Sequence, residues 1–165
     1  MFIRAFVFCV GLAGALGAAQ FPAYSQQYMQ RLGGAVAALD VVVADFDSSA
    51  AAAGLNRDDA LEQMQGTAFL DRRQQDMRRA FERHAALQKD LAALKGLGPF
   101  MRAYRSAHLM DQEIAAGTWQ AFQPGLPLSF ASGVFAALGF LLGALAASIL
   151  ARAARPKWAR RALPA

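Results

Sequence analysis

Two long stretches without charge frame this chain. Residues 5–30 contain no charged side chain, and after Glu113 none appears until Arg152. Within the second stretch, residues 128–151 make a helix of about 36 Å, longer than the ~30 Å hydrocarbon core of a bilayer. The first apolar run, residues 5–21, gives about 26 Å and extends further if Arg4 places its charge among the headgroups. The pattern predicts two transmembrane helices, within residues 1–21 and 124–151.

The first run also has the features of a cleaved signal peptide. An early arginine precedes an apolar core, and Gly17, Ala18 and Ala19 offer small residues to a signal peptidase. The sequence leaves retention and cleavage of residues 1–19 both open, and N-terminal sequencing of the mature protein distinguishes them.

The segment between the two runs, residues 22–123, has a helical pattern. A coiled-coil-like seam at alternating spacings of three and four predicts a helix over residues 22–52, through Met29, Leu32, Val36, Leu39, Val43 and Phe46. Asn56 is expected to cap a short helix, with Asp59 as its partner. Further helices are predicted over residues 68–95 and 100–116. We therefore expect an all-α fold: two transmembrane helices flank an extracytoplasmic helical hairpin or small helical bundle.

The distribution of charge favours a membrane over a nucleic acid as the partner. The chain has 17 basic and 12 acidic residues, and every acidic residue lies within residues 40–113. Five cations follow the second run, namely Arg152, Arg155, Lys157, Arg160 and Arg161. Because basic residues beside a span stay in the cytoplasm, both termini are predicted to be cytoplasmic and residues 22–123 periplasmic. The tail, residues 152–165, is read as a topology anchor, with anionic lipid as an alternative ligand.

Small residues recur every four positions in both apolar runs. The second run carries Gly139, Gly143 and Ala147, and the first carries Gly14 and Ala18. Such faces let helices approach closely. Either the two runs pack on each other within one chain, which we favour, or copies of the chain pack into a homo-oligomer.

The sequence offers little that indicates catalysis. His84 lies on an apolar helix face, where a histidine is a candidate proton switch or metal ligand. No second ligand stands four residues away, which favours an ordinary half-buried histidine. We expect no enzymatic activity, no cofactor and no metal. A single cysteine, Cys9, excludes a disulfide within the chain.

The residues that follow the first run form a distinctive pattern, QFPxxxQQYxQRLGG, over residues 20–34. With this pattern and the Trp119, Pro124 and Pro127 that precede the second run, the chain resembles an uncharacterised proteobacterial inner-membrane protein family, known only as a domain of unknown function. The resemblance covers nearly the whole chain. It implies a bacterial inner-membrane setting, implies nothing about activity, and supplies no catalytic residues.

The candidate interaction residues are His84 and six polar and aromatic residues of this pattern. We call the six the collar residues, because they are predicted to lie just outside the membrane: Tyr24, Gln26, Gln27, Tyr28, Gln30 and Arg31. They are suited to lipid headgroups, to a partner protein, or to other helices of the same chain, the last being slightly favoured.

The functional prediction is a membrane-anchored helical interaction or scaffold protein. Its expected partners are the lipid bilayer and either a second copy or another membrane protein, and no nucleic acid is expected. The alternative is a small oligomeric channel or transporter accessory subunit, built on the glycine-bearing spans.

Overall fold

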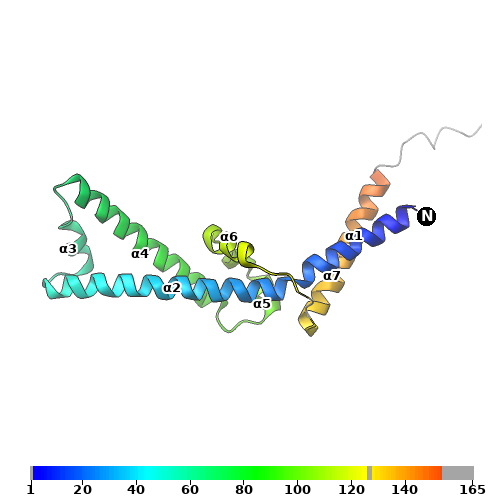
Figure 1. Ribbon diagram of the computed structural model, residues 1–165, viewed down its shortest axis with the longest axis horizontal. Coiled ribbons are helices and arrows are strands. Elements are labelled where there is room, and N and C mark those ends of the chain that lie inside the picture. Colours follow the sequence, from blue (N-terminus) through cyan, green and yellow to red (C-terminus); the bar gives the residue numbers. More distant parts are fainter. Residues whose placement is uncertain (1, 126–127, 154–165) are drawn as a thin grey trace, which may run out of the picture. The chain divides into compact units, whose positions relative to one another are not determined.

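Every regular element in the described part of the chain is helical. The computed structural model describes residues 2–125 and 128–153 (Figure 1). In chain order the elements are α1 (Phe2–Ala19), α2 (Phe21–Ala52), α3 (Arg57–Glu62), α4 (Ala68–Leu94), α5 (Pro99–Tyr104), the 3-10 helix η1 (Ser106–Leu109), α6 (Gln112–Ala121) and α7 (Phe130–Ala153). The predicted all-α fold, with helices between two long apolar ones, is confirmed.

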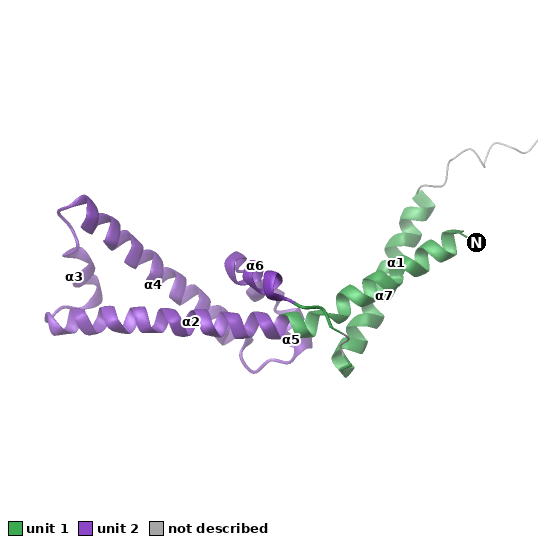
Figure 2. Cartoon of the chain, viewed as in Figure 1, with its two compact units in different colours: residues 1–24, 123–165 green, residues 25–122 purple. Residues whose placement is uncertain are grey.

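The chain forms two compact units (Figure 2). The first, which we call the span unit, comprises residues 1–24 and 123–165 and holds α1 and α7. The second, the central unit, comprises residues 25–122. Two helical stretches are long and apolar enough to cross a membrane. One begins with α1, within Phe2–Ala52, and the other is α7. At the helical rise α7 is about 36 Å long and α1 about 27 Å.

A proline ends α1 and a glutamine organises the turn that follows. Pro22 lacks the amide hydrogen that would bond to the carbonyl of Ala18, so the helical hydrogen-bond ladder is interrupted there. The side chain of Gln20 donates to the Gly125 carbonyl at 3.0 Å and accepts from the Gly125 amide at 3.4 Å. These two bonds fix the segment that precedes α7 beside the end of α1.

In the span unit α1 and α7 pack backbone against backbone. A Cβ atom added to Gly14 or to Gly139 would collide with the carbonyl oxygen of the other, and one on Gly143 would lie 2.8 Å from the Val10 carbonyl oxygen. Ala147 is also buried. Only residues without a side chain permit this approach, which is how helices associate in lipid. The small residues singled out in the second run thus lie at a contact within one chain.

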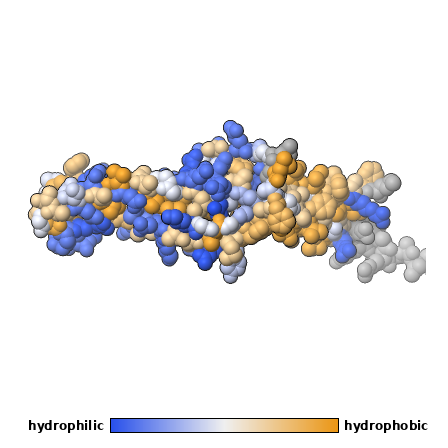
Figure 3. All heavy atoms as spheres, turned by 90° about the horizontal axis from the view of Figure 1, so that it is seen from below, coloured by the Kyte–Doolittle hydropathy of each residue, from blue (hydrophilic) through white to orange (hydrophobic). Residues whose placement is uncertain are grey.

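The outer faces of α1 and α7 carry large apolar side chains. Most of their leucines and phenylalanines are exposed, including Phe6, Leu16, Leu141, Leu142 and Leu145. The space-filling view shows a largely apolar surface over these helices, whereas the central unit mixes polar and apolar residues (Figure 3). A surface of this kind is what a helix presents to lipid.

The central unit uses the seam that the spacing predicts. On α2 the buried residues include Tyr28, Leu32, Val36 and Val43. On α4 they are Met77, Leu87 and Leu94. The two helices meet through Phe46 and Phe81, whose ring centroids lie 5.2 Å apart in an edge-to-face arrangement.

Capping residues and glycines shape the connections between these helices. The side chain of Asn56 accepts a hydrogen bond from the Asp59 amide, 2.9 Å away, and so caps α3 as expected. Thr67 caps α4 in the same way through the Leu70 amide. Gly54 and Gly96 have positive φ angles at the ends of α2 and α4, where side chains are disfavoured.

The prediction of one helix over residues 100–116 is wrong. The segment instead forms α5, η1 and α6. The reason is Asp111, whose backbone is extended and whose carboxylate accepts from the Ile114 amide at 2.9 Å. Asp111 therefore starts a new helix instead of continuing the old one, and the turn before it tightens to 3-10 geometry.

Candidate functional site

Three of the collar residues contact other helices of the central unit. Tyr28 is fully buried, and its hydroxyl oxygen accepts a hydrogen bond from the Asp111 amide at 3.2 Å. Gln26 accepts from the guanidinium of Arg102 on α5 at 2.8 Å. A Cβ atom on Gly117 of α6 would collide with the guanidinium of Arg31, so the glycine leaves room for this side chain.

The other collar residues differ in their exposure. Tyr24 belongs to the span unit by chain position and is half-buried. Gln27 is half-buried and Gln30 is exposed. The collar is therefore not a single exposed surface, because its aromatic and cationic members Tyr28 and Arg31 point into contacts with α6 and the turn before it.

A polar cluster that the sequence did not reveal lies next to Tyr28. The Arg83 guanidinium bridges Asp111 at 3.2 Å and Glu113 at 2.6 Å. His108 Nδ1 lies 2.7 Å from the carboxylate of Asp90, which is on α4. Asp90 lies 18 positions from His108 along the chain, a distance at which periodicity gives no signal.

His84 is paired across two helices. Its Nε2 lies 2.5 Å from the carboxylate of Asp40 on α2, and its side chain is 14% exposed. Within residues 2–125 and 128–153 no group of three or more histidine, cysteine or acidic residues is arranged to hold a metal ion. The geometry describes a seam histidine that links α2 to α4 through one carboxylate.

An ion pair between Arg57 and Asp47 lies near the end of the seam, where the chain passes from α2 to α3. Arg57 donates two hydrogen bonds to the Asp47 carboxylate, at 2.7 and 2.5 Å, and its guanidinium lies 4.7 Å from the centre of the Phe81 ring. The hydrogen bonds from Arg57 hold the pKa of Asp47 below its ordinary value, against a smaller opposing effect of burial. The same pairing raises the pKa of Arg57.

Beside this contact is an open groove between α2 and α4. It has a volume of about 340 Å³ and is lined by Val42, Asp45, Phe46, Ser49, Arg73 and Met77. The neighbouring Val41 is 59% exposed. The sequence placed Val41 and Val42 inside a helical pattern but gave no indication that both remain uncovered.

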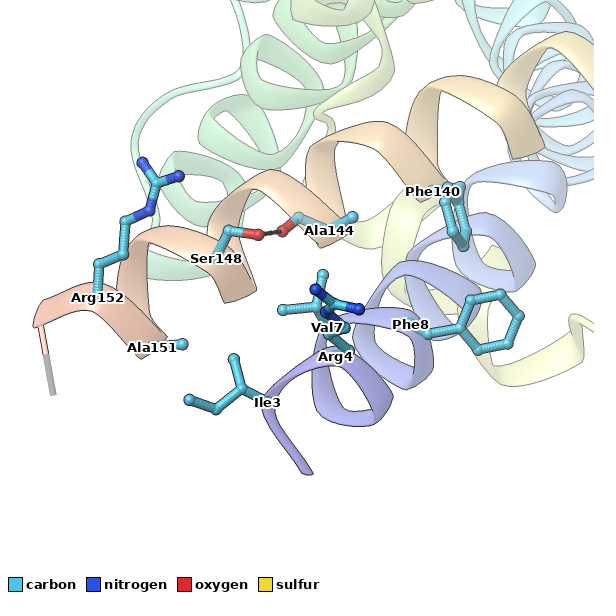
Figure 4. A pocket seen from close by; sticks show the side chains of 9 residues that line it. All are labelled: Ile3, Arg4, Val7, Phe8, Phe140, Ala144, Ser148, Ala151 and Arg152. Carbon is cyan, nitrogen blue, oxygen red and sulfur yellow. Dashed lines mark hydrogen bonds between the residues drawn. The ribbon is translucent and has the colours of Figure 1, made fainter. Parts of the chain in front are cut away.

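A larger cleft lies in the span unit, between the N-terminal half of α1 and the C-terminal half of α7 (Figure 4). Its volume is about 410 Å³, and its walls are Ile3, Arg4, Val7, Phe8, Phe140, Ala144, Ser148, Ala151 and Arg152. Arg152 is the first of the five predicted anchor cations. The other four, Arg155, Lys157, Arg160 and Arg161, lie outside the described residues.

The chain was compared with known families, curated proteins and solved structures. A family model described as "Protein of unknown function (DUF2937)" matches residues 2–160. The chain belongs to this family. The match confirms the resemblance to a domain of unknown function and adds no activity. No curated protein and no solved structure matches the chain.

Proposed function

We propose that this DUF2937 member is a two-pass protein of the bacterial inner membrane, in which the central unit is periplasmic and serves as an interaction scaffold. Both termini are then cytoplasmic, and α1 and α7 cross the bilayer. No catalytic role and no cofactor form part of the proposal.

The membrane placement is supported by length, surface and charge together. α7 is long enough to cross the hydrocarbon core, and its large exposed side chains are mostly leucine and isoleucine. Residues 1–24 and 123–165 contain no acidic residue, while six cations stand at the outer ends of the two apolar runs. The placement of those cations favours a cytoplasmic location for both ends.

Retention of α1 is supported by its fit to α7. A signal peptide that is cut off needs no complementary surface, whereas Gly14 lies against Gly139 and Gln20 binds Gly125. A phosphatase fused after Gly54 tests the orientation, since it is active only outside the cytoplasm. Inactivity of that fusion overturns the topology, and a mature chain that begins at Gln20 overturns retention.

The observation that carries the scaffold role is the groove between α2 and α4. Its walls include Val42, Phe46 and Met77, and its rim carries one acid and one base, Asp45 and Arg73. An apolar groove with a charged rim suits the apolar face of a partner helix. Val41 and Val42 are exposed next to this groove, and exposed apolar patches on soluble surfaces often mark interaction sites.

Site-specific photo-crosslinking in cells tests the scaffold. A photoreactive residue at Val42 is expected to give a defined adduct, whose mass tells a second copy from another membrane protein. The matched control is Lys89 on the exposed face of α4, which is expected to give none. A photoreactive residue in place of Ser49, which also lines the groove, should give the same adduct. Combining Val41→Ser with Phe46→Ser should abolish that adduct. If the protein inserts into the membrane and position 42 still gives no adduct, the scaffold role of this groove is overturned.

The channel alternative is less well supported. An oligomeric pore built on the glycine faces needs those faces free, but Gly139 and Gly143 are in contact with α1 of the same chain. Crosslinks between the α7 helices of two copies through position 143 would favour the pore over the scaffold.

A further inference from the structure

The cleft between α1 and α7 results from how the two helices cross. They meet at Gly14 and Gly139, where no side chain separates the backbones. Beyond the crossing, α7 presents Phe140, Ala144 and Ala151 toward α1, and the two alanines are too short to fill the widening space. The cleft of about 410 Å³ is what remains (Figure 4).

The walls of the cleft are apolar along its depth. Ile3 and Val7 line it from α1, and Ala144 and Ala151 from α7 (Figure 4). The hydroxyl of Ser148 is bonded to the Ala144 carbonyl at 2.7 Å, so its hydrogen is already used within α7. From Gly139 to Arg152 the helix rises about 20 Å, which is enough to span the ~15 Å depth of one leaflet of the hydrocarbon core.

The mouth of the cleft is cationic. Arg4 and Arg152 are its two charged lining residues, one from each helix, and both are exposed. Residues 1–24 and 123–165 contain no aspartate or glutamate, so the span unit itself supplies no acidic counter-charge. An occupant that matches the whole cleft must therefore be anionic at one end and apolar along the rest.

We propose that this cleft binds one anionic phospholipid, with an acyl chain between α1 and α7 and the phosphate between Arg4 and Arg152. Arginine suits phosphate because its planar donors pair with two oxygens at once. A soluble anion matches the mouth but not the walls, and a zwitterionic lipid matches the walls but brings its own cation to the mouth. The inference rests on the proposed membrane placement.

The test uses full-length protein in nanodiscs with a photoreactive phosphatidylglycerol that carries its diazirine in the acyl chain. Labelled sites are mapped by peptide mass spectrometry and are expected in residues 3–8 and 144–152. Unlabelled phosphatidylglycerol should compete, while phosphatidylcholine and inorganic phosphate should not. At a probe concentration below saturation, Arg4→Gln and Arg152→Gln should each lower the labelling of residues 3–8 and 144–152 about fivefold.

A second variant separates the site from general attraction by charge. Ala144→Phe fills the cleft and keeps both arginines, so it should abolish labelling at residues 3–8. Leu145→Phe adds the same ring on the exposed side of α7 and should leave labelling unchanged. If Ala144→Phe does not insert, the arginine variants alone decide the question.

Four outcomes overturn the proposal. Equal competition by phosphatidylcholine indicates ordinary boundary lipid, and competition by inorganic phosphate indicates an anion site without a lipid. Labelling confined to the outer faces of α1 and α7 rejects the cleft while leaving the membrane placement intact. Absence of any labelling of α1 and α7 rejects the membrane placement as well.

Discussion

The span unit and the central unit are both made of packed helices, but different contacts hold each together. In the span unit the closest contacts join backbone to backbone, at Gly14, Gly139 and Gly143. In the central unit the contacts are between side chains, through a buried seam on α2 and α4. Most large apolar residues of α1 and α7 face outward, whereas the leucines and valines of the α2–α4 seam face inward.

This difference follows from the surroundings proposed for each unit. In lipid, burying a leucine between helices gains little, because the lipid tails are equally apolar, so close packing of small residues decides association. In water the same burial contributes roughly 1.5–3 kcal/mol per large side chain, so a leucine seam decides it. The polar links also divide this way: the described ion pairs, such as Arg83 with Asp111 and Arg57 with Asp47, are all in the central unit.

The largest expected effect comes from the seam of the central unit. Leu87→Ala empties a fully buried site and should lower the free energy of unfolding by about 3 kcal/mol. Denaturant unfolding of the purified protein, followed by circular dichroism, measures this change. Val41→Ala, at an exposed site on α2, is the control and should change the same quantity by less than about 0.5 kcal/mol. Equal effects of the two variants would contradict the assigned seam.

The corresponding test of the span unit adds volume instead of removing it. Gly139→Val places a side chain against the Gly14 carbonyl and should destabilise the α1–α7 contact by about 2 kcal/mol. A crosslink between cysteines introduced in the two helices reports this contact. Gly133→Val is the matched control, since open space surrounds Gly133 in the same helix. A crosslink that survives Gly139→Val would show that the helices do not meet at this glycine.

A smaller effect is expected where a collar residue joins the seam to α6. Tyr28→Phe keeps the buried ring but leaves the Asp111 amide without its hydroxyl partner, at a cost of about 1 kcal/mol. The free energy of unfolding measures it. Tyr104→Phe removes the same group from a side chain that is 84% exposed and should have no measurable effect.

The smallest expected effect depends on pH. Because the pKa of Asp47 is lowered in the folded state, its pairing with Arg57 stabilises the protein above the ordinary pKa of 3.8 and is lost as the pH falls through the lowered value. Asp47→Asn should therefore cost about 0.5 kcal/mol at neutral pH, since both side chains are partly exposed. Unfolding of the two proteins at pH 7 and at pH 2.5 measures the difference, which should shrink in acid. A difference that grows in acid would contradict the assignment.

The sequence by itself determined the helical class, the two long apolar helices and the seam of α2. These depend on local patterns: uncharged length, spacing of three and four, and caps such as Asn56, whose partner is three residues away. The same reasoning missed the break within residues 100–116, where Asp111 caps a new helix through the nearby Ile114 amide and is held by Arg83 and Tyr28, which are distant in sequence.

Only the tertiary structure decided how the candidate residues are used. It paired His84 with Asp40 and His108 with Asp90, buried Tyr28, and left Val41 and Val42 uncovered. It also showed that Arg4 and Arg152, from opposite ends of the chain, line one cleft. Periodicity places a residue on a face of its own helix, but which helix covers that face depends on contacts between segments far apart along the chain.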